Sequence, residues 1–165
     1  MQRITNYRYI EAIGYAFSLL PSNLSERLSY VHFFTGTDPV FAGLHDFIDT
    51  QDGRSYRNTA HACFSESALN NRERTTIVLP ELDDANPYVI VHELGHCLDE
   101  ILGFSHLAIP INKYAETNRR EAFAESFAAQ YFWLGLDAEA IFQSDKAIQQ
   151  LFREIMGGGN HALSK

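Results

Sequence analysis

His92, Glu93 and His96 form a His-Glu-x-x-His pattern near the middle of the chain. Residues four apart lie on the same face of an α-helix, so both imidazoles can bind one metal ion. Glu93 is rotated from His92 by about 100° around the helix, close enough to take a proton from a water on that ion. The spacing therefore predicts two nitrogen ligands, a general base and an open coordination position, which together suit a zinc-dependent hydrolase.

Apolar residues surround this pattern, from Val89 to Leu98, and Asp99 and Glu100 close the segment with acid. The same pattern occurs by chance on exposed helices that bind no metal. A buried helix face is different, because polar groups without partners are costly there. The apolar context therefore favours a metal site over a chance match.

The helix that presents the two histidines is predicted to run from residue 87 to 102. Asn86 can cap its start, and Pro87 fits the first turn. Gly103 is a typical residue for the end of a helix. The local sequence therefore places the pattern in the interior of one well-delimited helix.

A second helix is predicted from residue 118 to 135, with Thr117 or Asn118 as its cap. Glu121 and Glu125 are four apart and share one face of this helix. One carboxylate can be the third metal ligand while the other fixes a ligand histidine through its second ring nitrogen. The alternative is a pair of solvated acids on the polar face.

Other schemes for the third ligand fit the sequence less well. The metzincin pattern requires glycine at position 99 and histidine at position 102, where this chain has Asp99 and Leu102. His106 lies beyond residue 102, the predicted end of the helix that presents the two histidines. The following helix therefore remains the best source of a ligand.

The combined pattern resembles the gluzincin zinc metallopeptidases, in which a glutamate on a following helix completes the site. The block from Tyr114 to Phe127 is similar to that of the anthrax lethal factor catalytic domain and the small Pro-Pro endopeptidases. In that family a tyrosine precedes the glutamate ligand by seven residues, and a second glutamate follows it by four. The resemblance, which covers roughly residues 60–132, implies that Glu121 is a zinc ligand, that Tyr114 stabilises the transition state and that Glu125 supports the ligands from outside.

Two alternatives remain for the ligand set. Glu116 follows the second histidine by twenty residues, as in thermolysin-type peptidases, but Arg120 replaces the acid that those enzymes carry four residues later. Glu121 is therefore preferred over Glu116. A peptide deformylase would use a cysteine ligand such as Cys63, but the segments around Cys63 and the second histidine depart from that family's pattern.

The composition limits the possible partners. The chain of 165 residues has a formal net charge of −8 and only 13 lysines and arginines, so a nucleic-acid partner is not expected. No apolar run approaches the roughly 20 residues of a membrane helix. Cys63 and Cys97 are too few for a disulfide framework, which favours two buried thiols.

The N-terminal segment has two interpretations. Residues 12–21 are apolar and follow Arg3 and Arg8, as in a weak signal peptide. However, apolar residues recur at intervals of three and four from Ile4 to Leu20, which favours an amphipathic helix. We therefore expect a cytoplasmic protein without a cleaved signal.

The pattern of elements predicts an α+β fold, and the family resemblance implies a zincin-like one, with a small mixed sheet or hairpin packed on the two site helices. Residues 61–65 and 75–80 are predicted to pair as a hairpin with a long loop. Pro80 either ends the second strand or marks it as an edge, and such an edge would pair with an extended peptide or be blunted by the loop and Pro80. The other predicted strand is 30–35, and the other predicted helices are 4–20, 24–28 with caps Ser22 and Asn23, 38–48 and 138–156. A single domain is expected over 1–165, with an N-terminal subregion (1–58), a metal-site core (59–135), a last helix (136–156) and a tail (157–165).

The expected function is that of a zinc-dependent endopeptidase that acts on a peptide or protein substrate, with Glu93 as the general base. The alternative is a phage-type or regulatory protein that cleaves or binds one specific protein partner. Zinc retention does not require Glu93, so its presence favours the enzyme.

Overall fold

The computed structural model describes residues 6–35, 61–63, 76–79, 85–103, 108 and 110–132. The elements in this part of the chain confirm the α+β class. The helices predicted over 38–48 and 138–156, and the tail, lie outside the described residues. In chain order the elements are α1 (Tyr7–Leu19), α2 (Ser22–Leu28), β1 (His32–Thr35), β2 (His61–Cys63), β3 (Thr76–Leu79), α3 (Pro87–Ile101), the 3-10 helix η3 (Ala115–Thr117) and α4 (Arg119–Ala129).

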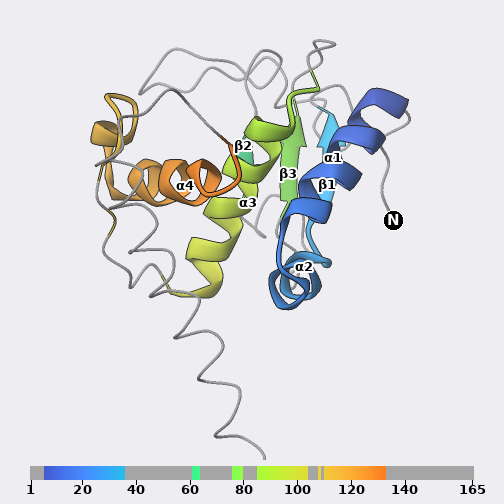
Figure 1. Cartoon of the computed structure of the whole chain (residues 1–165), viewed down its shortest axis with the longest axis horizontal. Coiled ribbons are helices and arrows are strands. Elements are labelled where there is room, and N and C mark those ends of the chain that lie inside the picture. The colour runs from blue at the N-terminus through green and yellow to red at the C-terminus, as the bar shows by residue number, and fades with distance from the viewer. Residues whose placement is uncertain are drawn as a thin grey trace, which may run out of the picture. The chain divides into compact units, whose positions relative to one another are not determined.

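The chain forms two compact units, residues 1–98 and 99–165, and the boundary between them falls inside α3. The first unit contains the sheet, whose strand order is β1-β3-β2 (Figure 1). β1 is parallel to β3, with Phe33 opposite Ile77, and β2 is antiparallel to β3, with Ala62 opposite Ile77. The predictions of a mixed sheet and of pairing between the strands near 61–65 and 75–80 are therefore confirmed.

Of the two interpretations of Pro80, the end of the strand is confirmed, because β3 stops at Leu79, and the edge strand is wrong. β3 is the central strand of the three, and all four of its residues are buried. Proline at position 80 comes after the last residue of β3, so it removes no N–H from the paired segment. Because β3 is paired on both sides, an extended peptide cannot add to it, and the hypothesis of peptide pairing at this strand fails.

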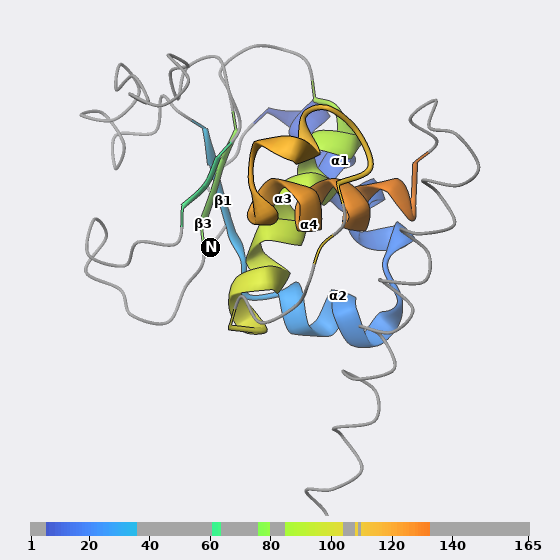
Figure 2. The same cartoon turned by 90° about the vertical axis from the view of Figure 1, so that its left-hand side faces the viewer.

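The helices α1 and α2 lie to the same side of β1 and β3 (Figure 2). Phe17 of α1 meets Phe33 of β1 edge-to-face, with ring centroids 6.2 Å apart. α1 has the predicted amphipathic character and ends before Pro21. Pro21, and neither Ser22 nor Asn23, is the N-cap of α2, because its extended backbone leads directly into a helix that begins at residue 22. The buried side chains of α1 are Tyr9, Ala12, Ile13 and Ala16.

The caps predicted for α3 are confirmed. Asn86 Oδ1 accepts a hydrogen bond from the Tyr88 N–H at 3.0 Å, and Pro87 is the first helical residue. Gly103 has φ +67°, a left-handed conformation that costs glycine little and stops the helix. Every residue from 90 to 99 is buried, so α3 is a core helix.

The second unit contains η3 and α4, which contact each other. Asn118 caps α4 as predicted, with its Oδ1 accepting from the Glu121 N–H at 3.0 Å. α4 ends at Ala129, six residues before the predicted end at 135. The next N–H groups bond three residues back, Tyr131 to the Ala128 carbonyl at 3.0 Å, which tightens the chain out of α-helical geometry. No helix in the described part of the chain could span a membrane.

Candidate metal centre

His92 and His96 lie one turn apart on α3, and both are buried. Their rings meet edge-to-face at 84°, with centroids 4.9 Å apart. Tyr88 lies one turn before His92, and the two ring centroids are 6.3 Å apart. The helix therefore places both imidazoles on one face and inside the protein, as the four-residue spacing predicts.

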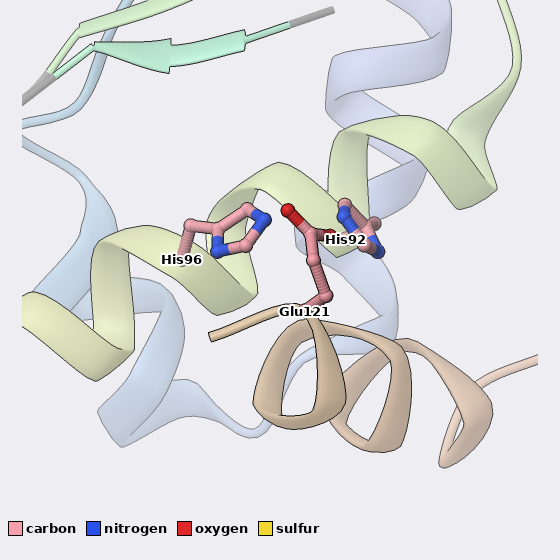
Figure 3. Close-up of side chains that lie close together, drawn as sticks. All are labelled: His92, His96 and Glu121. Atoms are coloured by element: carbon pink, nitrogen blue, oxygen red, sulfur yellow. The ribbon is translucent and has the colours of Figure 1, made fainter. Parts of the chain in front are cut away.

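Glu121 is the third residue of α4 and is half-buried. The cap at Asn118 defines where this helix starts, and with it the position of Glu121 in the first turn. The possible ligand atoms of His92, His96 and Glu121 all lie within 4.8 Å of one another. Figure 3 shows the carboxylate of Glu121 directed toward the two imidazoles.

The donor set of this cluster suits zinc. Two ligands bound at about 2.1 Å in a tetrahedral arrangement are about 3.4 Å apart, so donor atoms within 4.8 Å need only small side-chain rotations to reach one ion. Two imidazoles and a carboxylate leave the fourth position open. Closed structural zinc sites instead use four protein ligands, usually with cysteine among them.

Glu93 is as buried as the histidine beside it, with 6% of its surface exposed. The burial of an acidic side chain is costly, and this cost argues for a role next to charged or polar groups. Its place on α3, directly after His92, is that of the general base in the His-Glu-x-x-His pattern.

Glu125 is buried, so it is not a solvated acid of the helix surface. Its Oε2 accepts a hydrogen bond from Asn112 Nδ2 at 2.5 Å, and Asn112 Oδ1 accepts from the Ala115 N–H at 2.8 Å. Asn112 therefore connects Glu125 to the turn that leads into η3. This connection was not predicted from the sequence, which suggested a histidine as the partner of Glu125.

Tyr114 immediately precedes η3 and is 41% exposed. The bond from Ala115 to Asn112 holds the same turn, so the backbone at Tyr114 is tied to α4 through Glu125. Glu116 lies in η3 and is exposed, and the ligand cluster found among the described residues does not include it. His106 and the side chain of Cys63 lie outside the described residues.

Asp99 and Arg119 form an ion pair that the sequence analysis missed. Arg119 Nη1 donates to Asp99 Oδ1 at 3.0 Å, and Nη2 donates to Oδ2 at 2.5 Å. Asp99 is fully buried. The available signal was its position on α3, three residues after His96, where an acid on the inner helix face needs a cation.

Cys97 is fully buried and is a reduced thiol, as expected for a packing residue. Burial raises the pKa of the Tyr131 phenol above its ordinary value of 10.0, since a low-dielectric surrounding disfavours the phenolate.

Comparisons of the chain with protein-family models, with curated proteins and with solved structures find no match. The residues and geometry of the site are therefore the basis on which a function is inferred.

Proposed function

We propose that this protein is a zinc-dependent endopeptidase of the gluzincin type with a zincin-like fold. The observation that carries the proposal is the convergence of His92, His96 and Glu121, whose ligand atoms lie within 4.8 Å of one another. A helix pair with this ligand set leaves one coordination position open, which is the arrangement of a catalytic metal.

When bound there, zinc would supply a Lewis acid that polarises the scissile carbonyl and lowers the pKa of a water to about 7. Glu93 would take the proton of that water and later deliver it to the leaving amine. The phenol of Tyr114 would donate a hydrogen bond to the carbonyl oxygen as negative charge develops on it. The 41% exposure of Tyr114 is compatible with contact to a substrate that arrives from solvent.

The proposal is tested with Glu93→Gln, which keeps the size of the side chain and removes the base. Wild-type protein and variant are loaded with zinc, their metal content is measured, and both are incubated with a peptide library. We expect one zinc per chain in both proteins and cleavage by the wild type alone. Equal cleavage by both proteins would contradict the assignment of Glu93.

The regulatory alternative gives a different outcome in the same experiment. Zinc at one per chain, with no peptide cleaved by the wild type, would favour a protein that binds its partner without cutting it. A wild-type chain that binds no zinc would remove both the ligand assignment and the endopeptidase proposal.

A further inference from the structure

A partly buried ion pair in the second unit joins α3 to the start of α4. Arg119 donates to both carboxylate oxygens of Asp99, at 3.0 and 2.5 Å. The side chain of Asp99 is fully buried, and that of Arg119 is 32% exposed. Two parallel charge-assisted hydrogen bonds from a planar guanidinium fix direction as well as distance.

Each partner of the pair stands close to a proposed zinc ligand. Asp99 follows His96 by three residues, so it lies one turn further along the same side of α3. Arg119 is the first residue of α4 and precedes Glu121 by two. Because α3 is continuous from His92 to Asp99, the pair attaches the first turn of the Glu121 helix to the helix that carries both histidines.

Stability alone is a weak reason for an ion pair in which one partner is fully buried. Apolar residues of similar volume often stabilise a protein as well or better, since a buried charge such as that of Asp99 loses its hydration. A bidentate pair has a property that apolar contacts lack, namely a defined relative orientation of the two segments. That property is the one a metal site needs when its ligands come from two helices.

We propose that the Asp99–Arg119 ion pair positions Glu121 for zinc. The inference rests on the proposed zinc site and extends it, because it assigns a role to two residues outside the ligand set. A carboxylate held near its final place before the ion arrives loses less conformational freedom on binding. The pair therefore raises zinc affinity without touching the metal.

The experiment measures the zinc dissociation constant of the full chain by competition with a chromogenic chelator. Arg119→Lys keeps the charge but gives one point contact where the guanidinium gives two, and we expect zinc affinity to fall about 10-fold. The paired change Asp99→Leu with Arg119→Met replaces the ion pair by apolar contact. It should leave the melting temperature of the metal-free protein near the wild-type value while zinc affinity falls about 10- to 100-fold. The matched control is Arg120→Gln, an exposed cation at the next position, which should bind zinc as the wild type does.

A double-mutant cycle separates positioning from a general structural effect. In a Glu121→Ala background, which has no side-chain ligand at this position, Arg119→Lys should cause no further loss of zinc affinity, because the ligand that it positions is gone. Wild-type zinc affinity in both Arg119 variants would overturn the inference, as would an equal loss in the presence and absence of Glu121. If the single variant Glu121→Ala binds zinc like the wild type, the proposed function fails instead, so the two failures are distinguishable.

Discussion

Replacing Glu121 by glutamine tests which acid completes the metal site. The ligand atom of Glu121 lies within 4.8 Å of those of both histidines, whereas Glu116 is exposed in η3. Structural zinc sites with four ligands bind with apparent free energies of about 10–16 kcal/mol, or about 2.5–4 kcal/mol per ligand. A neutral amide oxygen is a weaker ligand than a carboxylate but still a ligand. The expected loss of binding free energy is therefore the lower end of this range, about 2.5 kcal/mol. We expect Glu121→Gln to weaken zinc binding about 100-fold.

The assay is the zinc-induced shift of the melting temperature. At a zinc concentration 1,000 times the wild-type Kd, binding stabilises the wild type by about 4.1 kcal/mol. A 100-fold weaker variant at the same concentration gains about 1.4 kcal/mol. For a chain of 165 residues, the difference lowers the zinc-induced shift by about 5–10 °C.

Glu116→Gln is the matched control, because it makes the same chemical change five residues earlier at an exposed position. Its zinc-induced shift should equal that of the wild type. A reduced shift in Glu116→Gln with a full shift in Glu121→Gln would refute the ligand assignment and favour the thermolysin-like spacing.

Three further changes test other parts of the structure. Tyr114→Phe should lower peptide turnover by about 10²- to 10³-fold and leave zinc content unchanged, since it removes one oxyanion donor; an unaffected rate would remove that role. Asn112→Ala takes away the hydrogen bond to the buried Glu125, so the free energy of unfolding should fall by about 1–3 kcal/mol in urea titrations, and an unchanged midpoint would show that the link is weak. Tyr131 keeps its proton in the folded protein above pH 10, where the unfolded chain loses it, so stability should fall as pH rises past 10. Tyr131→Phe should flatten this alkaline loss and stay within about 1 kcal/mol of the wild type at pH 7, because the Oη has no hydrogen-bond partner among the described residues.

The features that the sequence predicted well are those that depend on neighbours within one helix turn. Asn86 and Asn118 start their helices, and Gly103 ends α3, because each cap is a local hydrogen-bonding or backbone-conformation problem. The pairing of His92 and His96 belongs to the same class, since one helical period separates them. Local chemistry was therefore enough to place half of the candidate site.

The features that the sequence did not predict depend on contacts between distant residues. The central place of β3 requires β1 on its other side, and β1 lies more than forty residues earlier in the chain. Nothing within residues 75–80 distinguishes an edge strand from a central one when a proline follows the strand. Strand order is decided by burial on both faces, which appears only when the whole sheet is assembled.

Two acids near the candidate metal centre, Asp99 and Glu125, show the same difference between local and long-range features. Spacing alone did not predict that Asp99 binds Arg119 or that Glu125 binds Asn112, because these partners lie 20 and 13 residues away in the chain. Both contacts bring together segments that flank Glu121 in the chain, one at the start of α4 and one through the turn before η3. A ligand on a separate helix keeps a fixed position only if contacts hold that helix. Here Asp99 holds the start of α4, and Asn112 holds α4 through Glu125. The motif predicts two of the proposed ligands from local spacing, whereas the contacts of Arg119 and Asn112 depend on the fold of residues 99–132.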